Sequence, residues 1–180
     1  VKDGDYYILN GVKQWITNGE VADIYSVLAL TDKSKGPRGS SVFIVEKGTP
    51  GFTFGKKENK MGIRASMTTE LIFQDCRIHK DNLISREGMG FIVAMKTFDK
   101  ARPGIGAQAL GIGQSALEES VAFIKEREQF GKPISSFQGV QFMLADMATR
   151  VESARSLIYA TARMMDAGGK NVSLASSMCK

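Results

Sequence analysis

The apolar residues of this chain follow one pattern up to about residue 84 and another beyond it. In the first part they form short runs rich in Val, Ile, Tyr, Phe and Thr, which are typical of β-strands and lie at 6–9, 15–17, 25–30, 42–45, 52–54 and 71–73. Asn10-Gly11 predicts a type I′ hairpin turn, because both residues tolerate positive φ. The Gly-Thr-Pro-Gly segment at 48–51 predicts a further turn. We therefore expect an all-β domain, barrel-like or sandwich-like, at residues 1–84.

From residue 85 to residue 180 the apolar positions recur at helical spacing. The residues that carry this spacing are Phe91, Met95, Phe98, Val140, Leu144, Met147, Val151, Ala154 and Ile158. They predict one helix over 89–125 and a second that begins near Ser136, with Ser135 or Ser136 as N-cap, and ends at 168–169. A third helix should begin near Val172. The whole chain is therefore predicted to be of the α+β class, with part of an all-α bundle at 85–180.

Two features inside the first predicted helix need interpretation. Gly104, Gly106, Gly111 and Gly113 approach a dinucleotide fingerprint, but they do not follow a strand, so we expect them to allow close approach of a neighbouring helix or of a ligand. Pro103 has no amide hydrogen and its ring crowds the carbonyl of Asp99, which predicts a kink beside Asp99 and Arg102.

Composition excludes several classes of protein. Hydrophobic residues make up 43% of the chain and charged residues 24%, as in ordinary globular proteins, and no apolar run is long enough to span a membrane. No signal peptide is visible, and Cys76 and Cys179 form no disulfide-type ladder, which favours an intracellular protein that is not secreted. His79 is the sole histidine, so no metal centre is expected. The net charge of +5 is spread over loops without a basic stripe, which argues against nucleic-acid binding.

The segment 127–138 joins the two longest predicted helices and carries the residue types that hold a nucleotide. A planar guanidinium suits a pyrophosphate, and an exposed aromatic ring can stack on a purine. The residues concerned are Arg127, Gln129, Phe130 and Gln138. The alternative is an ordinary helix-loop-helix with a solvated Arg and a core Phe.

Three further strings surround this segment in a fixed order. They are Asn-Gly-Val-Lys-Gln-Trp-Ile-Thr-Asn-Gly at 10–19, Phe-Asp-Lys-Ala-Arg-Pro at 98–103 and Phe-Met-Leu-Ala-Asp-Met at 142–147. With these motifs the chain resembles the acyl-CoA dehydrogenase family over essentially its whole length, and the short- to medium-chain and butyryl-type members most. The resemblance implies a middle β-domain followed by the first part of a C-terminal helical domain, and we expect both ends of the chain to be cuts within a longer protein.

The resemblance also implies an activity. Members of this family use FAD to remove the α-proton and the β-hydride of an acyl-CoA thioester in fatty acid β-oxidation, give the trans-2-enoyl-CoA, and pass electrons to electron-transfer flavoprotein. A homotetramer built as a dimer of dimers is expected, in the bacterial cytoplasm or the mitochondrial matrix. An acyl-CoA oxidase-like protein, an enoyl-CoA reductase on the same scaffold and a catalytically silent helical interaction module remain alternatives.

The same resemblance assigns roles to individual residues. It places Trp15, Ile16 and Thr17 at the flavin ring, although Trp15 could instead be a core residue of a strand. It places the ADP half of FAD, held mainly by a neighbouring subunit, against Arg127, Gln129, Phe130, Ile134, Phe137 and Gln138. The family often has His where Phe137 stands, which puts that polar contact in doubt. It places the acyl-CoA at Phe98, Asp99 and Arg102, for which a simple intrahelical ion pair is the alternative.

No residue of the chain is expected to be the catalytic base. Most family members carry this Glu far downstream, beyond Lys180, and a minority carry it immediately before the residue that corresponds to Arg102. Here that position is Ala101, which accepts no proton. Glu118 and Glu119 lie more than four helical turns further along. The 180 residues alone are therefore expected not to turn over acyl-CoA.

Overall fold

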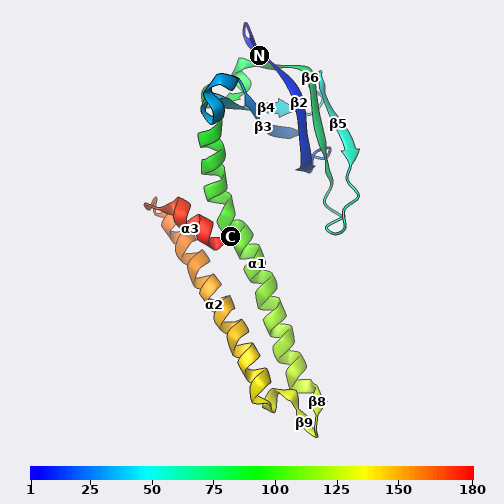
Figure 1. Cartoon of the computed structure of the whole chain (residues 1–180), viewed down its shortest axis with the longest axis vertical. Coiled ribbons are helices and arrows are strands. Elements are labelled where there is room, and N and C mark those ends of the chain that lie inside the picture. Colours follow the sequence, from blue (N-terminus) through cyan, green and yellow to red (C-terminus); the bar gives the residue numbers. More distant parts are fainter. The chain divides into compact units, whose positions relative to one another are not determined.

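Seven strands form two antiparallel sheets in the first part of the chain (Figure 1). The computed structural model describes residues 1–180, which divide into two units, Val1–Met95 and Lys96–Lys180. The four-stranded sheet has the order β1-β2-β6-β5 and the three-stranded sheet the order β3-β4-β7, so the strands form no closed barrel. The strand bounds are β1 Lys2–Asp3, β2 Tyr6–Thr17, β3 Ile24–Leu30, β4 Ser40–Glu46, β5 Phe52–Lys57, β6 Thr68–His79 and β7 Leu83–Ile84.

The inward-facing residues of both sheets form one apolar core. β3 alternates buried and exposed residues along its length, as a strand with one covered face should. Phe52 and Phe73 stack across β5 and β6 with ring centroids 4.8 Å apart. The buried members of the core are Tyr7, Leu9, Tyr25, Val27, Phe43, Val45, Phe52, Leu71, Phe73, Cys76 and Ile78.

The hairpin predicted at Asn10-Gly11 is wrong, because β2 runs through both residues without a turn. Leu9 pairs with Cys76 and Gly11 with Phe73, so β6 carries one extra residue here and forms a β-bulge. The Asn10 side chain holds this bulge: its oxygen accepts from the Asp75 amide at 2.8 Å, and its nitrogen donates to Asp75 Oδ1 at 3.0 Å. Asp75 itself has a φ of 49°. The turn predicted at 48–51 is present between β4 and β5.

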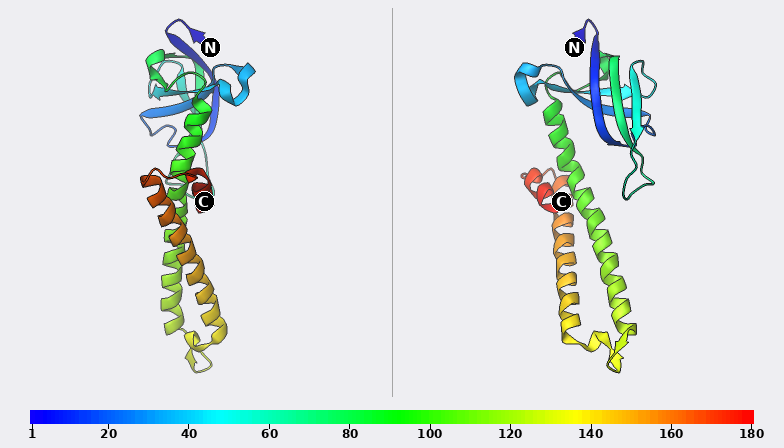
Figure 2. Two further views of the ribbon diagram at one scale, coloured as in Figure 1. Left: turned by 90° about the vertical axis from the view of Figure 1, so that its left-hand side faces the viewer. Right: turned by 45° about the vertical axis from the view of Figure 1, so that its right-hand side comes forward.

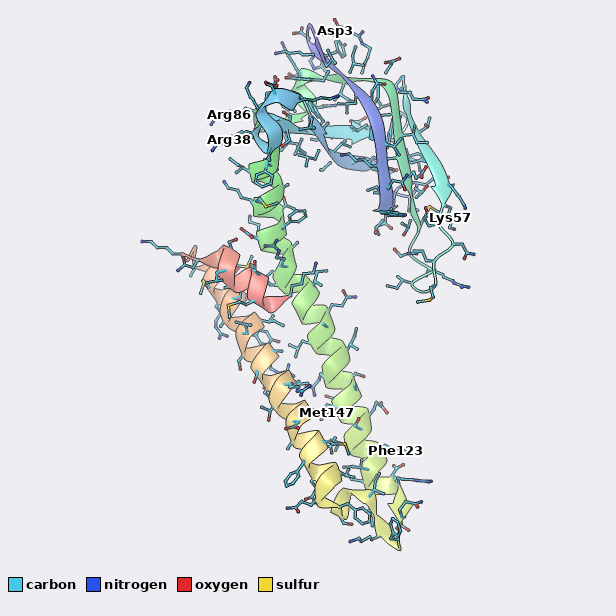
Figure 3. All side chains as sticks on the ribbon, viewed as in Figure 1. Asp3, Arg38, Lys57, Arg86, Phe123 and Met147 are labelled. Atoms are coloured by element: carbon cyan, nitrogen blue, oxygen red, sulfur yellow. The ribbon has the colours of Figure 1, made fainter.

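Three helices follow, and their positions confirm the predicted helical segments. They are α1 Gly90–Glu126, which begins in the first unit, α2 Gln138–Asp166 and α3 Val172–Cys179. α1 continues through Pro103 as one element. The six predicted inner positions of α2 from Val140 to Ile158, including Met147, are all buried or half-buried (Figure 3). Sheets followed by helices confirm the α+β class.

The predicted serine N-cap of the second helix is wrong. Ser135 and Ser136 belong to the short 3-10 helix η3, Ile134–Ser136, and α2 begins at Gln138 with Phe137 as N-cap and no side-chain capping bond. The Ser136 hydroxyl donates to the Pro133 carbonyl at 2.8 Å instead. The first turn of α2 is therefore not capped by a protein side chain.

In the second unit α3 packs against α1 and α2 (Figure 2). A Cβ atom at Gly106 would lie 2.4 Å from the Cys179 carbonyl oxygen, so a larger residue at this position would displace α3. Cys179 Sγ also lies 3.3 Å from the buried Thr161 hydroxyl of α2. The prediction that glycines of α1 admit a neighbouring helix is confirmed at Gly106.

The division of the chain by contacts falls after Met95, whereas the change of sequence pattern falls between residues 84 and 85. The predicted domain boundary stays a prediction. None of the helices is both long and apolar enough to cross a lipid bilayer.

Candidate functional site

The Trp15 segment of β2 contains a second bulge. Lys13 pairs with Leu71 and Ile16 with Thr69, so Gln14 and Trp15 together stand opposite one residue, Glu70. Gln14 Nε2 donates to Glu70 Oε1 at 2.8 Å. Trp15 takes a φ of 55°, and 72% of the residue is exposed. The bulge therefore turns the indole ring away from the core, and the alternative of a core Trp is wrong.

The residues after Trp15 are fixed to the sheet. Ile16 packs half-buried against the core, while Thr17 is exposed and pairs with Thr68. The turn that follows is held from inside, because the buried Tyr25 hydroxyl lies within hydrogen-bonding distance of two of its carbonyls, those of Gly19 and Ala22. Burial raises the pKa of Tyr25, so its hydroxyl stays protonated as a donor. Trp15 and Thr17 thus project from a rigid strand end.

The segment after α1 is a short β-hairpin, which sequence reasoning did not predict. β8 Glu128–Gln129 pairs with β9 Lys132–Pro133, and the two linking residues have φ values of 54° at Phe130 and 74° at Gly131. Positive φ at both positions is the signature of a type I′ turn. Phe130 lies at the tip and is 91% exposed, so the alternative of a core Phe is wrong.

Trp15 and Phe130 share an unusual combination of properties. They are the two most exposed aromatic residues of the chain and the only aromatic residues with positive φ. The left-handed conformation costs a non-glycine residue about 1–2 kcal/mol. Glycine would avoid this cost at either position, and neither ring offsets it by being buried within the chain. Backbone strain at an exposed residue is a feature of ligand-binding positions.

A ring at the start of α2 and a lysine of β9 add ring surface and charge beside Phe130. Phe137 lies between two neighbours, the ring of Phe130 at 6.1 Å and the ammonium group of Lys132 at 4.5 Å. Arg127, at the other end of the hairpin, joins it through its backbone carbonyl, which accepts from the Ile134 amide at 2.8 Å. Its exposed guanidinium makes no ion pair in the chain. Gln129 and Gln138 are exposed.

This arrangement provides the parts of an anion site. The first turn of α2 has backbone N–H groups without a side-chain cap, and the positive end of a helix dipole favours an anion there. Lys132 is a cation that sequence reasoning missed; its only signal was its place beside Pro133. The six cofactor residues predicted in this segment are thus brought to one end of the helix pair; they are Arg127, Gln129, Phe130, Ile134, Phe137 and Gln138.

The predicted substrate residues lie elsewhere on α1. Arg102 Nη1 donates to Asp99 Oδ1 at 3.2 Å, so the intrahelical ion pair named as the alternative is present. Both side chains are partly covered, with exposed fractions of 33% for Arg102 and 25% for Asp99. α3 supplies serine hydroxyls to the pair, which sequence reasoning did not predict. Phe98, on the same helix, is 49% exposed.

Comparison with known proteins identifies the family. Residues 1–76 match the family model of the acyl-CoA dehydrogenase middle domain, and residues 88–180 match that of the acyl-CoA dehydrogenase C-terminal domain. The chain belongs to the acyl-CoA dehydrogenase family.

Individual relatives agree with this assignment. The chain is 52% identical to the short-chain specific acyl-CoA dehydrogenase of Clostridium acetobutylicum, over 93% of this chain and 44% of that protein. It is 51% identical to the acryloyl-CoA reductase (NADH) of Anaerotignum propionicum, over 97% of this chain and 44% of that protein. The structure of butyryl-CoA dehydrogenase from Megasphaera elsdenii matches with a TM-score of 0.93 and 50% identity, over 99% of this chain and 46% of that one. The chain thus spans less than half the length of these relatives.

Proposed function

We propose that this chain is the middle and first C-terminal part of an FAD-dependent acyl-CoA dehydrogenase. The full-length protein would convert an acyl-CoA thioester to the trans-2-enoyl-CoA and pass the electrons to electron-transfer flavoprotein. Family membership supports the reaction class, and the two exposed, left-handed aromatic residues carry the cofactor assignment. On this proposal residues 1–84 are the β-domain that contacts flavin and substrate, and residues 85–180 provide further substrate, cofactor and subunit contacts.

The residues present fit FAD in two places. Trp15 and Thr17 would meet the isoalloxazine ring, with the indole against its edge and the hydroxyl available to a flavin nitrogen or oxygen, while Ile16 anchors the strand. When bound there, FAD would supply the acceptor for the hydride of the substrate β-carbon. The exposed position of Thr17 gives its hydroxyl access to a ligand without opening the core.

The ADP half of FAD fits the hairpin and the start of α2. The guanidinium of Arg127 and the uncapped amides of α2 suit the pyrophosphate, and Gln129 and Gln138 add amide groups. The rings of Phe130 and Phe137, with Ile134, suit the adenine. The hairpin tip is exposed, and we propose that it reaches a cofactor held mainly by a second subunit, within a homotetramer. A monomer that retains FAD would contradict this sharing.

The chain positions the substrate but does not supply the base. A base must lie within hydrogen-bonding reach of the α-proton of the thioester. Ala101 offers no acceptor, and Glu118 is 17 residues further along the continuous helix α1, or ~25 Å at 1.5 Å per residue. On this proposal, as the family resemblance implies, the carboxylate comes from outside residues 1–180. Acyl-CoA dehydrogenation by these residues alone would contradict the proposal.

Thr17→Ala in the full-length protein tests the flavin assignment. Removal of the hydroxyl should change the flavin absorption spectrum and slow flavin reduction by acyl-CoA, because a hydrogen bond to the ring is lost. Thr53→Ala, which removes a hydroxyl from the exposed face of β5, is the matched control and should leave both unchanged. If Thr17→Ala also leaves spectrum, FAD retention and rate unchanged, Thr17 does not contact the flavin.

A reductase is the second candidate, because a relative with 51% identity carries the name acryloyl-CoA reductase (NADH). The two directions are separated by supplying either acyl-CoA with an electron acceptor or enoyl-CoA with reduced electron carriers, and comparing the rates. Rapid reoxidation of the reduced protein by oxygen would favour an acyl-CoA oxidase. A full-length protein that binds no flavin after reconstitution with FAD would favour the silent interaction module.

A further inference from the structure

Pro103 removes one backbone hydrogen bond from α1. In a regular helix the carbonyl of Asp99 would accept from the amide of residue 103, but proline has no N–H. The buried Ser176 hydroxyl of α3 donates to this carbonyl at 2.6 Å. Ser176 is fully buried, so without its hydroxyl the carbonyl would lose a partner inside the packed interface. Helix α3 is thus bonded to α1 at the Asp99 carbonyl, which Pro103 leaves without an amide donor.

Two exposed serines of α3 extend this contact to side chains. Ser173 Oγ donates to Asp99 Oδ1 at 3.0 Å. Ser177 Oγ accepts from Arg102 Nη1 at 3.1 Å and donates to the Ser173 carbonyl at 2.8 Å. With the Asp99–Arg102 ion pair these bonds close a ring between the two helices.

These hydrogen bonds use some of the polar side-chain atoms of Asp99 and Arg102 and leave the others available. Both hydrogens of Arg102 Nη1 have partners, Asp99 Oδ1 and Ser177 Oγ. Nε and Nη2 of Arg102, and Oδ2 of Asp99, make no hydrogen bond in the chain. The guanidinium is planar, so fixing Nη1 also fixes the direction of its remaining three N–H groups.

We propose that Ser173 and Ser177 of α3 are positioning residues for the acyl-CoA site: they act through Asp99 and Arg102 and orient the free donor and acceptor atoms toward the CoA portion of the substrate. This inference rests on the proposed substrate role of Asp99 and Arg102. It adds that the affinity for acyl-CoA depends on α3, although the serines themselves do not touch the substrate. Pre-orientation lowers the entropy lost on binding, so its loss raises KM more than it lowers kcat.

Steady-state kinetics of the FAD-loaded full-length protein with acyl-CoA tests this inference. Ser177→Ala removes the acceptor for Arg102 Nη1, and the KM should rise roughly three- to tenfold, which corresponds to one hydrogen bond of ordinary net strength. The kcat, the FAD content and Tm should stay near their original values. Ser177→Thr keeps a hydroxyl at an exposed helix position and should restore the KM. Ser120→Ala is the control, because this half-buried serine also donates to the carbonyl four residues back, that of Ala116, at 2.7 Å, but has no hydrogen bond to a charged side chain.

The outcomes separate this inference from the proposed function. A raised KM in Arg102→Ala and Ser177→Ala, with the original value in Ser177→Thr, supports both. A raised KM in Arg102→Ala with an unchanged KM in Ser177→Ala overturns the positioning role and leaves the substrate role of Arg102 intact. An unchanged KM in Arg102→Ala overturns the substrate role and the inference with it. A loss of kcat or Tm in Ser177→Ala that Thr does not restore shows a purely structural serine.

Discussion

Phe130→Gly separates the contribution of the ring to cofactor binding from its contribution to folding. The left-handed φ of 54° costs Phe130 about 1–2 kcal/mol, and glycine removes this cost. The substitution also removes the edge-to-face contact with Phe137, which is worth about 0.5–1.5 kcal/mol. The ring is 91% exposed, so almost no burial is lost. The two effects nearly cancel, and the hairpin should keep its stability within about 1 kcal/mol.

Cofactor binding should respond quite differently. If the ring stacks on the adenine of FAD, its removal should weaken binding by about 1–3 kcal/mol, the range found for a base on an aromatic side chain. This corresponds to a roughly 5- to 150-fold higher dissociation constant. The assay is a titration of the full-length apoprotein with FAD, followed by flavin fluorescence. Hydrogen exchange of the segment 128–133 reports the stability of the hairpin in the same samples.

Two matched variants complete this experiment. Phe130→Ala should lose the same FAD affinity as Phe130→Gly but should leave the hairpin less stable by about 1 kcal/mol, because alanine keeps the left-handed strain. Phe130→Tyr keeps a ring and should bind FAD almost as the unmodified protein does. Unchanged FAD affinity in both Phe130→Gly and Phe130→Ala would refute the reasoning, since the exposed ring would then have no role in binding the cofactor.

Three further substitutions test other parts of the structure. Arg127→Lys should weaken FAD binding about tenfold, because an ammonium group cannot form the two parallel bonds of a guanidinium, and equal affinity in the same titration would exclude a pyrophosphate contact. Asn10→Asp should lower the free energy of unfolding by about 1 kcal/mol at neutral pH, because it sets a second carboxylate against Asp75 and removes the amide donor. Denaturant unfolding at neutral pH measures that loss, and an unchanged free energy of unfolding would show that the Asn10 amide does not stabilise the bulge. Ser176→Ala should lower Tm clearly in the otherwise unmodified protein, because the Asp99 carbonyl loses its hydrogen-bond donor. In a protein that also carries Pro103→Ala, the same substitution should lower Tm little, because the new amide of residue 103 can donate to that carbonyl. Equal decreases of Tm in both proteins would show that the amide missing at Pro103 is unimportant.

The periodic parts of the fold were predictable because periodicity reflects burial. A helix must place every third or fourth residue on its covered face, and the positions from Val140 to Ile158 that the sequence marks as apolar are the ones covered in α2. The family strings at 10–19 and 98–103 likewise carried the assignment to the acyl-CoA dehydrogenase family, since each joins several chemically distinct residues in a set order. These features depend on local sequence alone.

Asn10-Gly11 and the serines before α2 show what local sequence could not decide. Asn-Gly favours positive φ in isolation, but β2 pairs with β6 on both sides of these two residues. The side chain of Asn10 binds the bulge of the partner strand instead. Ser136 is a good N-cap in isolation, yet its hydroxyl donates to the Pro133 carbonyl and α2 begins two residues later. Both outcomes depend on neighbours brought together by folding.

The sequence by itself determined the class of fold, the positions of the long helices and the family, and it named the residues that we propose for the cofactor and the substrate. Only the tertiary structure decided how these residues are presented. It placed Trp15 on a bulge and Phe130 at a hairpin tip, both exposed in strained backbone, and it brought serines of α3 to the carbonyl that Pro103 leaves without an amide. The physical reason is that side-chain identity is local, whereas exposure, strain and hydrogen-bond partners are set by segments distant in the chain.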